Sequence, residues 1–314
     1  MSLLSIESAT KRYATPAGDL QALDGVDLRL ERGQTLGLVG ESGCGKSTLA
    51  RAVMGLLPLS SGRIRFDGED IAALPRPRQL AWRARQQMVF QDPFASLNPR
   101  SRIGRILEEP LLLHGRGKAT ERRARVAAAL QRVGLAPQMA ARHPHEFSGG
   151  QRQRIAIARA LMLEPELLVC DEAVSALDVS VRAQVLNLLL ELRAERGLAL
   201  LFISHDLSVV QHLADRVAVM YLGRLVEEAP RAALWARPQH PYTQALIAAV
   251  PSTRPGAAAT ALPALLKGEL PSPLQRPGGC AFHPRCPRAI ARCSTERPEL
   301  RPLDGGHRVA CHLA

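Results

Sequence analysis

The chain has 314 residues, which is room for two domains of roughly 150 residues each. Hydrophobic residues make up 46% and charged residues 22%, which excludes a wholly disordered, collagen-like or low-complexity protein. The net charge of +12 favours anionic partners, and nucleic acid, anionic lipid headgroups and nucleotide phosphates all fit it. Only 4% of residues are aromatic, which argues against a base-stacking platform.

The sequence lacks the patterns of a membrane span and of a signal peptide, so we expect the chain to stay in the cytosol. No segment approaches the roughly 18 to 20 apolar residues that cross a bilayer, and Glu7 interrupts the N-terminal stretch where a signal peptide would be apolar. Six cysteines in a reducing compartment argue against structural disulfides. Four of them lie in the last 35 residues, which indicates metal or cluster ligation.

Strand-like and helix-like segments alternate through most of the chain. An apolar strand is predicted at 34–39, followed by a glycine-rich turn and a helix from 46 to 57. Residues 96–163 interrupt the alternation, and we predict a mostly helical insertion there. Further strands are predicted at 167–170 and 198–203. A helix is predicted at 121–133, because Val126, Leu130 and Val133 recur at helical spacing. A second helix is predicted between the two strands from the same spacing of Val181, Val185, Leu188, Leu189 and Leu192. This alternation is typical of an α/β fold.

The composition changes after Val250. Residues 255–279 contain five Pro and four Gly, which is typical of a linker or a wrapping segment. We therefore predict a first domain over 1–250, a linker over 251–279 and a cysteine-rich tail over 280–314. No internal repeat is present in the sequence.

The segment 40–48, GESGCGKST, follows a predicted strand and opens a predicted helix, which is the context of a P-loop. Glycines let successive N–H groups face a phosphate, and the helix N-terminus adds its positive end. Lys46 would reach the β- and γ-phosphates and the Ser47 hydroxyl would bind Mg²⁺. A thiol at a helix N-terminus can be reactive, although Cys44 is also small enough for the loop. The predicted ATP contacts here are Gly40, Ser42, Gly43, Cys44, Gly45, Lys46, Ser47 and Thr48.

A second acidic motif follows the strand at 167–170. Asp171 and Glu172 come directly after it, and such a pair could simply cap the next turn. Beside a P-loop, Asp171 is better interpreted as the carboxylate on the Mg²⁺ side and Glu172 as the base that orients water. Cys170 is predicted to pack in the core.

The pentapeptide FSGGQ at 147–151, followed by RQR, resembles the signature motif of ATP-binding cassette (ABC) ATPases. Gln91 resembles the Q-loop residue of this family, His205 the switch histidine and Tyr13 the adenine-stacking aromatic; SALD at 175–178 resembles the D-loop, and the motifs follow the family's order. The resemblance covers about residues 3 to 250. It implies a RecA-like core with an antiparallel β subdomain and a helical subdomain over 96–163. Phe147 replaces the usual Leu, and Ala173 stands where Pro is common.

The resemblance also implies roles and partners. The implied catalytic residues are Glu172, His205, Gln91 and Lys46, the implied Mg²⁺ ligands are Ser47, Gln91 and Asp171, and further nucleotide contacts come from Tyr13, Ser148, Gly149, Gly150, Gln151 and Asp178. In this family the signature of one subunit covers the ATP that its partner's P-loop holds. The chain is therefore expected to pair with a second ABC ATPase, itself or, preferentially, a different subunit.

Three strings narrow the resemblance: PHEFSGG at 144–150, VSALDVS at 174–180 and HPYTQAL at 240–246 are similar to the ATPase subunits of dipeptide/oligopeptide importers, most closely the F-type subunit. This similarity implies ATP-driven uptake of di- or oligopeptides or a related solute. It implies two transmembrane permease subunits, an extracytoplasmic solute-binding protein and no nucleic acid as partners. The expected location is the cytoplasmic face of the bacterial inner membrane.

The C-terminal cysteines form a C-x5-C-x6-C-x17-C pattern, at Cys280, Cys286, Cys293 and Cys311. Four thiolates can bind Zn²⁺ or a [4Fe–4S] cluster, but the C-x2–4-C pairs of typical zinc sites are absent. The resemblance favours a structural [4Fe–4S] cluster, because this subfamily carries the same tail. Three nearby histidines are expected at the surface or behind the ligands: His283, His307 and His312.

Two other functions remain open. A DNA-repair or chromosome-maintenance ATPase shares the same cassette and suits the positive charge. Such proteins usually insert coiled coils or zinc modules between P-loop and signature, whereas about a hundred residues separate Ser47 from Ser148 here. A redox or metal sensor that uses the cysteine tail is the more distant alternative.

Overall fold

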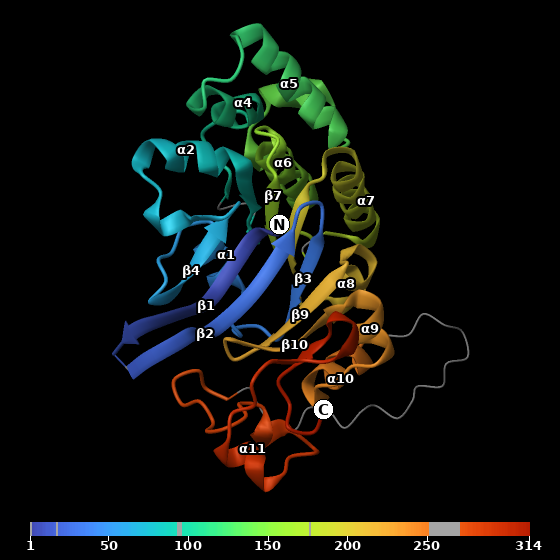
Figure 1. Cartoon of the computed structure of the whole chain (residues 1–314). Coiled ribbons are helices and arrows are strands. Elements are labelled where there is room, and N and C mark those ends of the chain that lie inside the picture. Colours follow the sequence, from blue (N-terminus) through green and yellow to red (C-terminus); the bar gives the residue numbers. More distant parts are fainter. Residues whose placement is uncertain (1, 17, 93–95, 176, 251–270) are drawn as a thin grey trace, which may run out of the picture. The chain divides into compact units, whose positions relative to one another are not determined.

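The computed structural model describes residues 2–16, 18–92, 96–175, 177–250 and 271–314 (Figure 1). The chain forms two compact units, which are described separately. The first contains residues 1–3, 30–34 and 67–203, and the second contains residues 4–29, 35–66 and 204–314. Most of the predicted linker, 251–270, lies outside the described residues, as does Ala176 in the predicted D-loop. The predicted domain boundaries remain a prediction.

The first unit contains three parallel strands in the order β6-β7-β8, with bounds Gln86–Val89, Leu167–Asp171 and Ala199–Ile203. The register pairs Val89 with Cys170 and Asp171 with Ile203. Every residue of β7 and β8 is buried, as expected for parallel strands that are covered on both faces. The two predicted strands at 167–170 and 198–203 are thus confirmed to within one residue at each end.

Helices make up much of the rest of this unit. Val126, Leu130 and Val133 are all at least 95% buried, which confirms the predicted apolar face of the helix at 121–133. The predicted helix between the strands is also present, and it buries Val185, Leu188, Leu189 and Leu192. The bounds are Arg76–Arg85 for α2, Ile103–Leu113 for α4, Ala119–Arg132 for α5, Gly149–Leu161 for α6 and Val179–Arg196 for α7.

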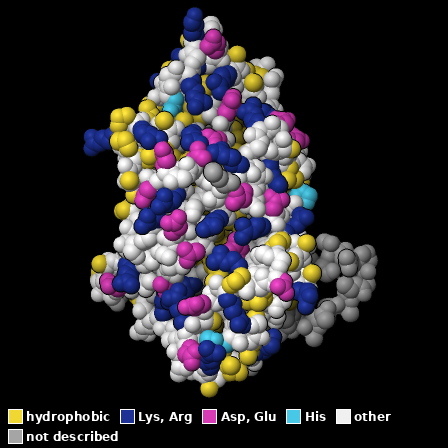
Figure 2. All heavy atoms as spheres, viewed as in Figure 1, with side chains coloured by type: hydrophobic (Ala, Val, Ile, Leu, Met, Phe, Trp, Pro, Cys, Tyr) yellow, Lys and Arg dark blue, Asp and Glu magenta, His cyan; other side chains and the backbone are white. Residues whose placement is uncertain are grey.

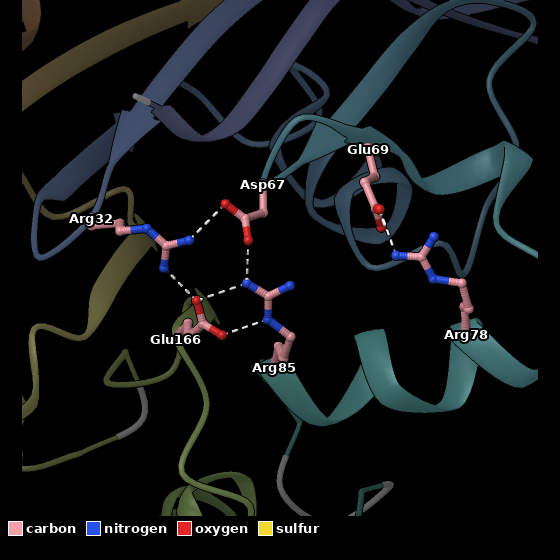
Figure 3. A network of polar contacts seen from close by, with 6 residues as sticks. All are labelled: Arg32, Asp67, Glu69, Arg78, Arg85 and Glu166. Carbon is pink, nitrogen blue, oxygen red and sulfur yellow. Dashed lines mark hydrogen bonds and ion pairs between the residues drawn. The ribbon is translucent and has the colours of Figure 1, made fainter.

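A closed network of two arginines and two acids joins four segments of the first unit (Figure 3). Arg85, which ends α2 directly before β6, donates to Asp67 at 2.6 Å and to Glu166 at 2.5 Å. Arg32 donates to Asp67 at 2.7 Å and also to Glu166. Glu166 directly precedes β7, and its backbone N–H donates to the carbonyl of Arg85 at 2.7 Å. The network therefore links the N-terminal ends of β6 and β7.

The second unit contains two sheets (Figure 1). One has the order β2-β1-β4, with β1 antiparallel to β4. The other has the order β3-β9-β10-β12-β11, in which β3 and β9 are parallel and the remaining pairs are antiparallel. The bounds are Ser2–Thr15 for β1, Gly18–Glu31 for β2, Thr35–Val39 for β3, Ser61–Phe66 for β4, Arg216–Tyr221 for β9, Arg224–Pro230 for β10, Arg301–Pro302 for β11 and Arg308–Val309 for β12.

The helices of the second unit are short. They are α1 at Lys46–Val53, α8 at Leu207–Leu213, α9 at Arg231–Ala236, α10 at Pro241–Ala248 and α11 at Ala291–Thr295. The helix α1 ends four residues before the predicted Leu57. Gly55 adopts a left-handed conformation with φ +63°, and the N–H of Leu56 turns back to the carbonyl of Arg51 at 2.9 Å. This is the usual way in which a glycine ends a helix.

The surface mixes charges of both signs. Figure 2 shows Lys and Arg side chains interspersed with Asp and Glu over the face that it displays. Such interspersion fits a solvated, arginine-rich surface. In the described part of the chain, we find no helix that combines the length and the apolar character needed to cross a membrane.

Candidate nucleotide-binding site

The phosphate loop, residues 40–48, connects β3 to α1 as the sequence predicted. Lys46 is only 4% exposed, and its ammonium donates to the carbonyls of Gly40 at 2.7 Å and Glu41 at 2.9 Å. These bonds fold the lysine back over the loop. The Nζ atom thus lies where the loop curls, as the chemistry of a phosphate cradle requires.

Two glycines of this loop occupy positions that a side chain could not share. Gly40 has φ +152°, and a Cβ there would lie 2.2 Å from the carbonyl oxygen of Met220. Gly45 has φ +109°, and its Cβ would lie 2.4 Å from the carbonyl oxygen of Ala22. The tight packing of the loop therefore demands glycine at both positions.

Cys44 and Cys170 are both buried, which bears on whether their thiols can react. Cys44 is 1% exposed, and burial raises the pKa of its thiol, although the nearby Lys46 acts in the opposite direction. Burial likewise raises the pKa of Cys170 to about 12. Both thiols stay protonated near neutral pH, so they act as small packing residues, as predicted for Cys170.

The predicted acidic pair lies at the end of β7. Asp171 is the last residue of this strand and is 4% exposed. Glu172 follows with φ +50°, a left-handed conformation that is uncommon for a residue with a side chain, and its N–H donates to the carbonyl of Ile203 at 3.0 Å. Glu172 Oε2 accepts a hydrogen bond from Gln91 Nε2 at 3.0 Å. Two side chains 81 residues apart in the sequence are thereby brought together.

The predicted signature residues begin α6. Ser148 is its N-cap, because its hydroxyl accepts from the N–H of Gln151 at 3.3 Å while Gln151 Oε1 accepts from the N–H of Ser148 at 3.0 Å. This capping box leaves the first-turn N–H groups of Gly149 and Gly150 without intrahelical partners, as at any helix N-terminus. Phe147 is 4% exposed, so the replacement of Leu in this motif is a buried packing residue.

The other predicted contacts lie at element ends or on strands. Asp178 caps α7 by accepting from the N–H of Val181 at 2.8 Å, and this bond lowers the pKa of its carboxyl group. His205 is exposed and lies between β8 and α8. Tyr13 is half-buried on β1, with the ammonium of Lys11 5.1 Å above its ring centre.

The described geometry thus distributes the predicted residues over both units. Tyr13, the phosphate loop and His205 belong to the second unit. Gln91, Asp171, Glu172, Ser148 to Gln151 and Asp178 belong to the first.

Comparisons with known proteins identify the family of the chain. The family model described as "ABC transporter" matches residues 23–175, and the model of the "Oligopeptide/dipeptide transporter, C-terminal region" matches residues 226–293. A probable peptide ABC transporter ATP-binding protein, y4tS of Sinorhizobium fredii, is 54% identical over 99% of this chain and 90% of its own length. The oligopeptide transport ATP-binding protein AppF of Bacillus subtilis is 53% identical over 96% of this chain and 92% of its own length.

The chain belongs to the ATP-binding subunits of the oligopeptide/dipeptide ABC transporter family. It is an ABC transporter ATPase. The dimeric, post-hydrolysis structure of the ATP-binding cassette MJ0796 bound to ADP and Pi matches with a TM-score of 0.68 and 28% identity, over 73% of this chain and 98% of that one. The predicted ABC ATPase fold is confirmed. The same matches decide between the transporter and the DNA-repair ATPase in favour of the transporter.

The predicted metal site at the C-terminal cysteines finds no support among the described residues. Among the residues that the structure describes, no group of three or more His, Cys, Asp or Glu side chains is arranged to hold a metal ion. Burial raises the pKa of Cys280 and Cys286, and the proximity of the other tail cysteines raises it further. The [4Fe–4S] or zinc site at Cys280, Cys286, Cys293 and Cys311 stays a prediction, because a metal ion would itself displace the thiol protons.

One histidine of the tail also differs from expectation. His307 is 6% exposed, and its Nε2 lies 2.6 Å from a carboxylate oxygen of Glu227 on β10. Glu227 is fully buried, and a buried carboxylate requires partners. The N–H groups of Gln239 and His240 supply two more, at 2.7 and 3.0 Å. His307 is thus a buried partner of Glu227, which sequence spacing alone did not indicate.

Proposed function

We propose that the chain binds ATP with Mg²⁺ and hydrolyses it to power the import of di- or oligopeptides through a bacterial membrane transporter. The observation that carries this proposal is identity above 50% over nearly the whole chain to proteins named for peptide transport, combined with the match of its C-terminal region. The buried Lys46 in a glycine-rich loop supports phosphate binding independently of any relative.

The roles of the residues in the proposal follow from their chemistry. Lys46 and the loop N–H groups bind the β- and γ-phosphates, and Tyr13 stacks on the adenine. Glu172 orients the attacking water, and His205 contacts the γ-phosphate side. Support for the role of Glu172 comes from its hydrogen bond to Gln91. This bond fixes one carboxylate oxygen and thereby the orientation of the whole carboxylate group.

The proposed Mg²⁺ ligands are oxygen donors: Ser47, Gln91 and Asp171. This donor set suits a hard cation, and the burial of Asp171 favours an ionic partner for its carboxylate. When bound, Mg²⁺ would neutralise charge on the phosphates. The protein contributes the fixed oxygen atoms.

Pairing completes the proposed site. Ser148, Gly149, Gly150, Gln151 and Asp178 face the ATP that a second ABC ATPase holds, and a different subunit is the preferred partner. Support comes from the open first turn of α6, whose N–H groups can bind phosphate oxygens. ATP then favours the closed pair and its hydrolysis favours opening. The helical segment 96–163 would dock two permease subunits at the cytoplasmic face of the membrane, supplied by a solute-binding protein outside.

Whether the cysteine tail binds a metal is tested separately. A [4Fe–4S] cluster, zinc or a sensing role was suggested by the sequence, and ATP hydrolysis as proposed requires none of them. Iron, acid-labile sulfide and zinc are measured in anaerobically purified chain and in a Cys280→Ser/Cys286→Ser variant. Iron and sulfide that disappear in the variant establish a cluster, and their absence from both proteins removes it.

Uptake measurements test the import itself. Cells that carry the chain with its co-purifying membrane subunits are given labelled di-, tri- and longer peptides. We expect uptake of at least one peptide class, and its loss in the Glu172→Gln variant at equal protein levels. Uptake that continues in this variant would contradict the role of hydrolysis, whereas an active ATPase that imports no peptide would contradict only the solute.

A further inference from the structure

Glu41, the second residue of the phosphate loop, is held at each of its polar groups. Its N–H donates to the hydroxyl of Tyr242 at 2.8 Å, and its carbonyl accepts from Lys46 at 2.9 Å. Its carboxylate accepts two hydrogen bonds from Arg285, Nη1 to Oε2 at 2.7 Å and Nη2 to Oε1 at 2.9 Å. Tyr242 and Arg285 follow Glu41 by 201 and 244 residues. Residues from the C-terminal part of the chain therefore grip the loop, and all four residues belong to the second unit.

The ion pair lies in a poorly solvated place. The side chain of Arg285 is 6% exposed and that of Glu41 is 27% exposed. Paired, parallel hydrogen bonds between guanidinium and carboxylate are among the strongest polar contacts in proteins, and they fix orientation as well as distance. The guanidinium carbon also lies 5.9 Å from the ring centre of Tyr221, whose hydroxyl is 3.5 Å from Nη1.

Three buried rings support this contact. Tyr221, Tyr242 and Phe282 pack against one another with ring centres 4.8 to 5.4 Å apart, and each is at most 1% exposed. Phe282 comes from the same turn as Arg285, whose N–H donates to the carbonyl of Phe282 at 3.0 Å. The rings therefore fix the turn that carries Arg285 against the strand and helix that carry the two tyrosines.

The same turn belongs to the cysteine-rich segment. Arg285 directly precedes Cys286, and the N–H of His283 donates to the carbonyl of Cys280 at 2.9 Å. The N–H of Cys280 in turn donates to the carbonyl of Cys293 at 2.8 Å. The backbone that orders this segment thus also places the guanidinium that the phosphate loop contacts.

We propose that Arg285 and Tyr242 are positioning residues of the phosphate loop, through which the C-terminal segment sets the affinity of the loop for ATP. A carboxylate beside bound phosphates repels them, and Arg285 neutralises that charge and turns it away. Tyr242 fixes the peptide plane between Gly40 and Glu41, and hence the start of the loop. The proposal rests on the proposed function, in which the Lys46 loop binds ATP.

The test compares Mg-ATP dissociation constants of full-length variants. Arg285→Ala leaves the Glu41 carboxylate uncompensated, and we expect affinity to fall about tenfold with little change in kcat. The double variant Arg285→Ala/Glu41→Gln removes the repelling charge, so it should recover to within about threefold of the wild type. Recovery by removal of a second group distinguishes electrostatic positioning from a loss of folding.

Further variants keep the test informative if Arg285→Ala folds poorly. Arg285→Lys keeps the charge without the paired hydrogen bonds, and Tyr242→Phe keeps the ring without the acceptor; each should weaken ATP binding by a factor of about three to ten. Arg292→Ala is the matched control, because Arg292 lies in the same segment and its side chain is 60% exposed and pairs with the exposed Glu296. It should leave affinity within about twofold.

Three results distinguish failure of the positioning proposal from failure of the proposed function. Unchanged ATP affinity in folded Arg285→Ala and Arg285→Lys would overturn the proposal. A double variant as weak as Arg285→Ala alone would also overturn it, because the loss would then be structural. The proposed function itself would be refuted if the wild-type protein did not bind ATP, or if Lys46→Ala bound ATP with unchanged affinity. The contact of Arg285 with Glu41 would then have only a structural role.

Discussion

At the scale of single residues, both the backbone and the side chain of Glu172 are held in a defined geometry. It takes a left-handed backbone conformation directly after a fully buried strand, and its side chain accepts from Gln91. A residue with a Cβ adopts that conformation at a cost of order 1 to 3 kcal/mol, which the surrounding hydrogen bonds must offset. The bond from its N–H to Ile203 on the neighbouring strand is one of them. The strain lies at the residue to which we assign water activation.

Lys46 gives the sharpest prediction at this scale. Lys46→Ala removes a charged contact to phosphate, and we expect ATP affinity to fall by a factor on the order of 10 to 100. Equilibrium binding of a fluorescent ATP analogue measures it. Lys118→Ala, at an exposed lysine before α5, is the control and should bind as the wild type does. Equal affinity in the Lys46 variant would contradict phosphate binding by this loop.

At the scale of elements, the network of Arg32, Asp67, Arg85 and Glu166 holds two strands at their N-terminal ends (Figure 3). The side chains are 35 to 49% exposed, so screening limits what each pair contributes. Hydrogen bonds from Arg85 and then Arg32 lower the pKa of both carboxyl groups. The stabilisation is therefore fully present above the unfolded pKa values, near 4, and is lost as pH falls through the lower folded values.

Arg85→Ala tests this network. We expect the melting temperature to fall by a few degrees at pH 7, because the loss of several screened pairs costs about 1 kcal/mol, and the difference should shrink below pH 4 and in 1 M salt. Arg78→Ala is the matched control, since Arg78 makes a single pair with Glu69 at 2.5 Å beside the network. A difference from the wild type that is independent of pH and salt would show that Arg85 acts by packing alone.

The elements also show what the sequence could and could not predict. Buried strands such as β7 and the helices around Val126 and Leu188 follow from local apolar patterns, and the phosphate loop follows from its glycines. The early end of α1 at Gly55 was missed because a glycine there can also continue a helix. Contacts such as Arg85 with Glu166 and Arg285 with Glu41 join residues 81 and 244 positions apart, and no local pattern encodes such pairs. The burial of His307 was missed for the same reason.

At the scale of the whole molecule, the proposed nucleotide contacts divide between two compact units. The phosphate loop belongs to one unit and the Glu172 carboxylate to the other. The proposed function requires a second cassette, whose bound ATP the first turn of α6 would contact. One of the matching solved structures is itself a cassette dimer bound to ADP and Pi.

Assembly of the Glu172→Gln variant tests this requirement most directly. The substitution keeps the phosphate loop but removes the group that activates water, so ATP should bind and persist. Light scattering measures the molar mass of the variant, alone and with the ATPase that co-purifies with it, with and without Mg-ATP. We expect ATP to raise the mass from one cassette to two, and Lys46→Ala in the same background to abolish the rise. A variant that binds ATP but remains a single cassette in both mixtures, or that hydrolyses ATP at the wild-type rate, would contradict the account.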